Sequence, residues 1–211
     1  LGEELLLQVA SVLRDPVTTT DELIPSGETS SYRSNPLKLA SFALSRRDPD
    51  YVPRARATQA LEETRRSGAM PPELQSVQKA LSIPDMGRVQ IGSVLFANKP
   101  GDGSAREQAA SCQKVLGGFA NICYEFATKR YRSNCINWGI LPFTLDAGTS
   151  FDYAPGDCVF VPGIRQAIEN GIEDIPARVI RTDGAVEDLM LHVKGLTDDE
   201  KEIILDGCLM N

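Results

Sequence analysis

The chain has 211 residues, 42% of them hydrophobic and 24% charged, a composition typical of one globular domain rather than a disordered segment. Its 22 basic and 29 acidic side chains leave a net charge of −7, which argues against general nucleic-acid binding, because such proteins present a basic surface. No apolar run approaches the roughly 20 residues that cross a bilayer, so we expect no membrane partner. The first residues carry neither a basic leader nor an initiating Met, and we interpret them as the cut end of a longer chain.

The cysteines and the single histidine exclude further chemistry. The five cysteines are Cys112, Cys123, Cys135, Cys158 and Cys208. They form no C-x-x-C pair, which argues against a zinc ribbon, a redox dithiol or a self-contained iron–sulfur site. We expect mostly buried thiols in a reduced, cytoplasmic setting. The only histidine, His192, lies in an apolar stretch and is interpreted as a strand residue, so neither a Ser-His-Asp nor a Cys-His mechanism is expected.

The N-terminal part of the chain is predicted to be mainly helical. Apolar residues recur at helical spacing over residues 3–14, which predicts a short amphipathic helix that Asp15 and Pro16 end. A polar, turn-rich segment follows. Residues 36–82 combine helix-forming stretches with five prolines, and seven arginines lie between Arg33 and Arg66. We expect helices and long loops there.

From residue 87 the pattern changes to short strands and short helices. Residues 89–96 read as a buried strand, and a glycine-rich turn follows at 99–103. Ser104 and Glu107 have the spacing of a capping box, so a helix is predicted to begin at Ser104 and to end before Gly117.

The remaining elements continue this alternation. Further strands are predicted at 119–122, 139–143, 158–161 and 177–180, a helical turn or two at 124–131, and a final helix at 198–205 capped by Thr197. Strands and helices that alternate in this way indicate one α/β domain.

The glycine turn has the features of an anion site. Gly101-x-Gly103-x-x-Arg106 lacks the third glycine of a dinucleotide fingerprint, and no G-K-[ST] follows it. A helix N-terminus nevertheless attracts negative charge, Arg106 offers a bidentate grip on a carboxylate, and the two glycines would let a small ligand approach the backbone. On spacing alone, the default interpretation is that Ser104 is a simple helix cap and Arg106 a solvated helix residue.

The residues around this turn also carry a family resemblance. Residues 101–110, GDGSAREQAA, resemble the G-x-G-S-S-R-E-H-A-A signature of the C-terminal swivel domain of the aconitase superfamily. The similarity continues through 116–118, Asn134 and 139–142. Upstream, residues 20–27, TDELIPSG, are similar to the family's T-D-H-I-S-x-A-G, and residues 197–208 resemble its closing helix. The resemblance therefore spans nearly the whole chain.

The resemblance implies a fold and four site residues. The implied fold is a single swivelling β/β/α domain, in the α/β class, of the aconitase C-terminal or isopropylmalate isomerase small-subunit type. Ser104 matches the serine whose alkoxide removes a proton next to a carboxylate, and Arg106 matches a carboxylate-binding arginine. Asp21 matches the aspartate of T-D-H, part of the catalytic hydrogen-bond set, and Arg33 matches a second substrate-binding arginine. The implied substrate is a di- or tricarboxylic 2-hydroxy acid.

Three departures from the pattern favour a divergent hydratase over aconitase itself. Ala105 replaces the second serine, Glu22 replaces the histidine of T-D-H, and Gln108 replaces a histidine after the arginine. These changes leave open a non-catalytic carboxylate-binding or regulatory module. A third interpretation is the small subunit of an isopropylmalate-isomerase-type heterodimer, which the extra material at 36–82 argues against.

The resemblance also implies what the chain needs from elsewhere. The family's [4Fe–4S] cluster is expected on other domains, and no cofactor is expected on this chain. Residues 1–211 are thus expected to form one aconitase-like swivel domain of a longer hydratase, with 36–82 as an insertion rich in Arg and Pro. Its partners are the remaining domains or a large catalytic subunit, and alone it is expected to be inactive. The basic run 129–132 is interpreted as a solvated or interdomain surface, given the acidic charge of the whole chain.

Overall fold

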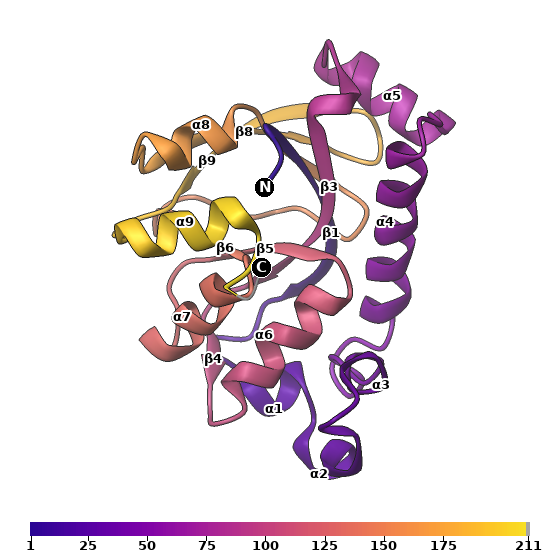
Figure 1. The fold of residues 1–211 in the computed structure, drawn as a ribbon. Coiled ribbons are helices and arrows are strands. Elements are labelled where there is room, and N and C mark those ends of the chain that lie inside the picture. Colours follow the sequence, from indigo (N-terminus) through magenta and orange to yellow (C-terminus); the bar gives the residue numbers. More distant parts are fainter. Residues whose placement is uncertain (210–211) are drawn as a thin grey trace.

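The computed structural model describes residues 1–209, apart from the side chains of residues 26, 28 and 30. Its centre is a closed seven-stranded barrel in the order β1-β3-β5-β6-β9-β8-β7 (Figure 1). The strands are β1 (Glu4–Leu13), β3 (Val89–Ala97), β5 (Gly118–Cys123), β6 (Leu141–Thr144), β7 (Cys158–Val161), β8 (Asp174–Ile180) and β9 (Val186–His192). β1, β3, β5 and β6 run parallel to one another. The remaining pairs, β1–β7, β7–β8, β8–β9 and β6–β9, are antiparallel.

The helix predicted over residues 3–14 is wrong, because this segment is the strand β1. It pairs with β3 on one side and β7 on the other. Its two faces meet different parts of the core: Leu5 and Leu7 point into the barrel cluster, while Leu6 and Ala10 belong to two clusters outside it. A strand buried on both faces has no polar–apolar alternation, and its continuous apolar run also satisfies a helical spacing.

The strands predicted in the second half of the chain are confirmed, and one helix is displaced. The last helix is α9 (Asp198–Asp206), with Thr197 as its N-cap and Gly207 as its C-cap. The helical turn predicted over 124–131 is wrong, since the helix is α7 (Lys129–Asn137). Residues 124–127 instead bond to the turn after β3, with Tyr124 N–H donating to Asn98 O (3.2 Å) and Ala127 N–H to Pro100 O (2.9 Å).

Residues 36–82, where helices and long loops were expected, form helices that pack on the barrel. They contain α3 (Pro36–Ala40), α4 (Tyr51–Arg66) and α5 (Pro72–Leu81), and a 3-10 turn at Met86–Arg88 leads into β3. α4 lies alongside β3 (Figure 1), and its Glu62 Oε2 accepts a hydrogen bond from Ile91 N–H at 2.5 Å. Arg65, one turn further on, bonds to the same carboxylate and to Met86 O (3.2 Å).

A small second sheet places the N-terminal motif, residues 20–27, next to the glycine turn at 99–103. It consists of β2 (Thr18–Thr19) and β4 (Pro100–Asp102), which run parallel. β2 leads directly into α1 (Thr20–Leu23), followed by α2 (Ser26–Thr29) and a 3-10 turn (Ser30–Tyr32). α6 (Arg106–Val115) follows β4, and α8 (Ile164–Glu169) lies near α9 (Figure 1). Two segments about 80 residues apart in sequence therefore meet below the barrel.

Candidate functional site

The glycine turn is held by close contacts with two other elements. Gly101 has φ +102°, and a Cβ there would overlap the buried ring of Tyr131 on α7. Gly103 has φ +131°, and a Cβ there would overlap the hydroxyl of Thr20 on α1. The prediction that these glycines admit a ligand to the backbone is therefore wrong: protein atoms occupy both positions.

The capping box predicted at Ser104 and Glu107 is also wrong. α6 begins at Arg106, its N-cap is Ala105, and no side chain caps it. Glu107 instead accepts hydrogen bonds from Asn134 Nδ2 (2.7 Å) and Trp138 Nε1 (2.9 Å) of α7 and its C-cap. The Ser104 side chain is exposed and makes no hydrogen bond within the described part of the chain. Because Gly103 is fixed against Thr20, the helix starts beyond Ser104 and leaves its hydroxyl available.

Ser104 and Arg33 line the same cavity. This cavity, of about 320 Å³, lies between the N-terminal motif and the start of α6. Its lining residues are Ile24, Thr29, Arg33, Leu39, Ser104, Ala105 and Gln108. The serine and the arginine come from segments that the sequence separates by about 70 positions, and the β2–β4 pairing brings them together.

Ser104 also borders a second cavity, of about 380 Å³, together with Arg106. Its remaining lining residues are Glu107, Lys129, Arg130, Ser133 and Asn134. The Arg106 guanidinium is tethered to the turn, because its Nη1 donates to Gly103 O at 2.6 Å. The structure thus brings three of the four predicted site residues together around one exposed hydroxyl. Lys129 and Arg130 also line this cavity, whereas the sequence indicated only a solvated or interdomain surface for their basic run.

Asp21 does not join them. Its side chain is 54% exposed, pairs with Arg46 Nη1 at 3.4 Å, and is not among the described residues that line either cavity. Its assignment to a catalytic hydrogen-bond set stays a prediction, and Arg46 is a partner that the sequence did not indicate.

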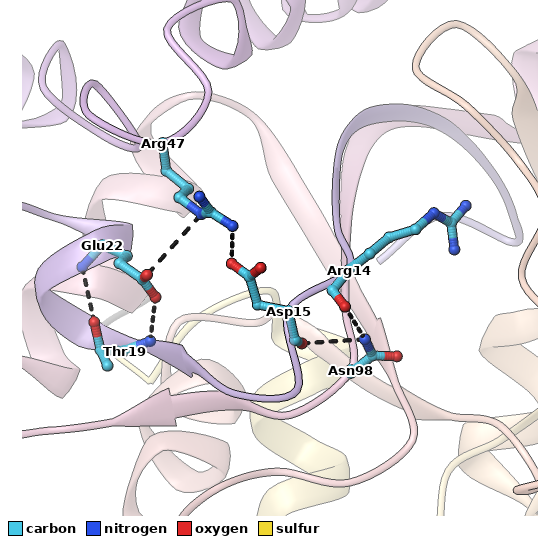
Figure 2. A network of polar contacts seen from close by, with 6 residues as sticks. All are labelled: Arg14, Asp15, Thr19, Glu22, Arg47 and Asn98. Carbon is cyan, nitrogen blue, oxygen red and sulfur yellow. Dashed lines mark hydrogen bonds and ion pairs between the residues drawn. The ribbon is translucent and has the colours of Figure 1, made fainter.

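Glu22, which stands where the resembled motif has a histidine, caps the helix α1. Figure 2 shows it capping α1: its Oε2 accepts from Thr19 N–H (2.7 Å), and Thr19 Oγ1 accepts from Glu22 N–H (3.2 Å). Its other oxygen lies 4.0 Å from Arg47 Nε, and Arg47 also pairs with Asp15. Asn98 Nδ2 then donates to the backbone carbonyl of Asp15 at 3.1 Å. The network ties α1 to the loop after β3.

A network of buried polar side chains next to the site joins α6 to α7. Gln113 Nε2 donates to Asn121 Oδ1 (2.7 Å), and Asn121 Nδ2 lies 3.4 Å from both Tyr131 Oη and Cys135 Sγ. Burial raises the pKa of Tyr131 well above its usual value and that of Cys135 to about 12. Both groups are therefore neutral at pH 7 and position the two helices rather than exchange protons.

The thiols of this chain do not fit an iron–sulfur cluster. All five cysteines are free, and all but Cys208 are buried. Burial raises the pKa of Cys112 to about 11 and that of Cys158 to about 12, and it raises the pKa of Cys123 as well. Among residues 1–209, no three His, Cys, Asp or Glu side chains are grouped so as to hold a metal ion. No helix in the same residues is long and apolar enough to span a membrane.

The fold and the site together define an α/β barrel domain with an exposed serine between two cation-lined cavities. The family model of the aconitase C-terminal domain matches residues 74–148, which include β3, the glycine turn, α6, β5, α7 and β6. Residues 74–148, about a third of the chain, are therefore similar to the aconitase C-terminal domain.

Two known proteins illustrate the relationship. Aconitate hydratase A of Bradyrhizobium diazoefficiens is 28% identical over 130 residues, which cover 58% of this chain and 14% of that protein. The crystal structure of 3-isopropylmalate dehydratase (leuD) from Methanocaldococcus jannaschii matches 98% of this chain and 90% of its own, with a TM-score of 0.53 and 23% identity. This likeness confirms the expected fold class. The chain spans a small fraction, 14%, of the aconitate hydratase that it matches.

Proposed function

We propose that the chain is the swivel domain of an aconitase-like hydro-lyase that acts on a di- or tricarboxylic 2-hydroxy acid. Ser104, as its alkoxide, takes the proton from the carbon next to a carboxylate, and the C–H electron pair forms a double bond to the neighbouring carbon. The hydroxyl group leaves that carbon as hydroxide, and it becomes water by taking up the proton that Ser104 removed, which restores the alkoxide. Arg33 and Arg106 bind the substrate's carboxylates. The observation that carries this proposal is that the exposed Ser104 shares one cavity with Arg33 and the adjoining one with Arg106.

The surroundings of Ser104 suit a serine that acts as a base. A serine hydroxyl is a very weak acid, so its alkoxide needs nearby positive charge. The hydroxyl lies at the N-terminal end of α6, where the helix dipole favours negative charge by about 0.3–1 kcal/mol, and up to ~2 kcal/mol in partly buried geometries. The guanidinium of Arg106, held at the turn by Gly103 O, adds a fixed cation.

The rest of the catalytic machinery lies in protein outside this chain. A [4Fe–4S] cluster, which would supply a Lewis acid for the departing hydroxyl, is assigned to further domains of the same polypeptide or to a large catalytic subunit. The isolated chain is then inactive. The small share of the aconitate hydratase that the chain matches supports this division. The free cysteines support a reduced, cytoplasmic location.

The test is a pair of serine variants in the protein joined to its remaining domains. Ser104→Ala is expected to lower turnover by a factor of about 10²–10⁴ or more, because it removes the general base. Ser111→Ala, within α6, is the matched control: Ser111 lines neither cavity, and its hydroxyl donates to Gln108 O (3.3 Å). Turnover of Ser104→Ala within tenfold of Ser111→Ala would refute the proposal.

A second candidate is a carboxylate-binding module without catalysis. The observation that favours it is the engagement of Glu22 in the capping box of α1, because this residue stands where the family has a histidine. Such a module would bind di- and tricarboxylates as tightly in the Ser104→Ala variant as in the wild type, and the joined wild-type protein would show no turnover.

A further inference from the structure

The second cavity is basic in an acidic protein. We call it the basic bay, defined by Arg106, Lys129 and Arg130 with the other residues that line it. The whole chain has a net charge of −7, yet these three cations form no salt bridge with any described residue. The only carboxylate in the lining is Glu107, which already accepts two hydrogen bonds from α7 and Trp138. The bay therefore has an unbalanced positive charge.

Two helices begin at the bay and the same turn fixes both. α6 begins at Arg106 and α7 begins at Lys129, so the positive end of each helix dipole faces this region. Thr128 caps α7 by accepting from Tyr131 N–H at 3.1 Å, and its hydroxyl also lies 3.4 Å from Gly101 O. The cations of the bay are thus carried by a rigid frame that the glycine turn holds together.

The two cavities beside Ser104 differ in their lining. The cavity that contains Arg33 includes the apolar side chains of Ile24, Leu39 and Ala105. The bay has no apolar side chain among its described lining residues. A ligand that reaches both cavities from Ser104 would therefore meet Arg33 and apolar side chains in one, and the charged ends of Arg106, Lys129 and Arg130 in the other.

We propose that Lys129 and Arg130 determine substrate specificity by binding a further carboxylate of the acid in the basic bay, which Ser104 borders and Arg33 does not. This inference rests on the proposed function and adds two residues to it. The exposed ends of both side chains lie at the bay, where an ammonium and a guanidinium recognise a carboxylate through charge-assisted hydrogen bonds. The site would then favour an acid with one more carboxylate over the same acid without it.

The test uses the 211-residue chain and two acids that differ by one carboxylate, propane-1,2,3-tricarboxylate and glutarate. The single tryptophan reports binding, because Trp138 Nε1 donates to Glu107, a lining residue of the bay. We expect the wild-type chain to bind the tricarboxylate at least tenfold more tightly than glutarate. In Lys129→Gln/Arg130→Gln this preference should be lost, with the Kd of glutarate changed less than threefold.

A control variant separates this effect from the loss of net charge. Arg56→Gln/Lys79→Gln removes the same two charges from exposed positions on α4 and α5, which lie across the molecule from α7 (Figure 1). Both affinities should stay within twofold of the wild type. No preference for the tricarboxylate in the wild-type chain, or equal loss for both acids in the Lys129 and Arg130 variant, would overturn the inference.

A third variant distinguishes this inference from the proposed function. Arg33→Gln should weaken both acids, because Arg33 is assigned to a carboxylate that they share. If Arg33→Gln weakens both acids while Lys129→Gln/Arg130→Gln weakens neither, the inference fails and the proposed function stands. Sulfate that binds as tightly as the tricarboxylate would make the bay a general anion site and would also overturn the inference.

Discussion

Replacement of Gly101 by alanine should destabilise the domain through its contact with Tyr131. The backbone at Gly101 has φ +102°, which costs an L-residue about 1–2 kcal/mol. The added Cβ would also lie 2.6 Å from the Cβ of Tyr131 and closer still to its ring. Tyr131 is fully buried and its hydroxyl is close to Asn121, so the ring has little room to move. Overpacking of this kind costs about 1–3 kcal/mol, and the expected total is about 2–5 kcal/mol.

Gly184→Ala supplies the matched control. Gly184 has a similar φ of +91°, but no atom lies within 4 Å of the position of an added Cβ. Its substitution should therefore cost only the backbone part, about 1–2 kcal/mol. Urea unfolding of both variants, followed by circular dichroism, gives the two free energies of unfolding. Equal losses in Gly101→Ala and Gly184→Ala would refute the argument that the Tyr131 ring determines the glycine at 101.

Two further predictions concern the thiols and a half-buried lysine. In the native chain only Cys208 should react rapidly with an aromatic disulfide reagent, because the other four thiols are buried with raised pKa values. All five thiols should react in denaturant. A second rapidly reacting thiol in the native chain would contradict this prediction. Burial lowers the pKa of Lys114 to about 8, so Lys114→Met should be more stable than wild type at pH 7 by on the order of 1 kcal/mol. As the pH rises, the folded protein releases this proton at a lower pH than the unfolded chain does. The free energy of unfolding of the wild type should therefore rise relative to that of the variant between about pH 8 and 10.5. A constant difference between their urea midpoints over this range would contradict the lowered pKa of Lys114.

The second half of the fold could be predicted from local sequence signals. β3 and β7 are short apolar runs between turn residues, and α9 has a capping box at one end and a glycine at the other. β1 could not be predicted, because its environment is set by distant elements. Its partners β3 and β7 begin about 85 and 150 residues later, and they cover both of its edges while other elements cover both of its faces.

Only the family resemblance indicated the candidate site, and the roles that it implies stay predictions. Ser104, Arg33 and Arg106 come together as the resemblance implied, whereas the capping-box spacing at Ser104 was misleading. That spacing is local, but the start of α6 depends on the contact of Gly103 with Thr20, which is a long-range contact. Lys129 and Arg130 face the bay because α7 begins at Lys129, and this start depends on the Thr128 cap and its contact with the glycine turn.

The most direct test of Ser104 as the base follows the substrate's own proton. With the complete protein in deuterium oxide, exchange of the hydrogen next to the substrate carboxylate can be measured by NMR spectroscopy, separately from overall turnover. Wild type and Ser111→Ala should exchange this hydrogen at similar rates, and Ser104→Ala should be slower by a factor of about 10² or more while still binding the acid. Exchange in Ser104→Ala at the rate of the wild type would show that another group removes the proton.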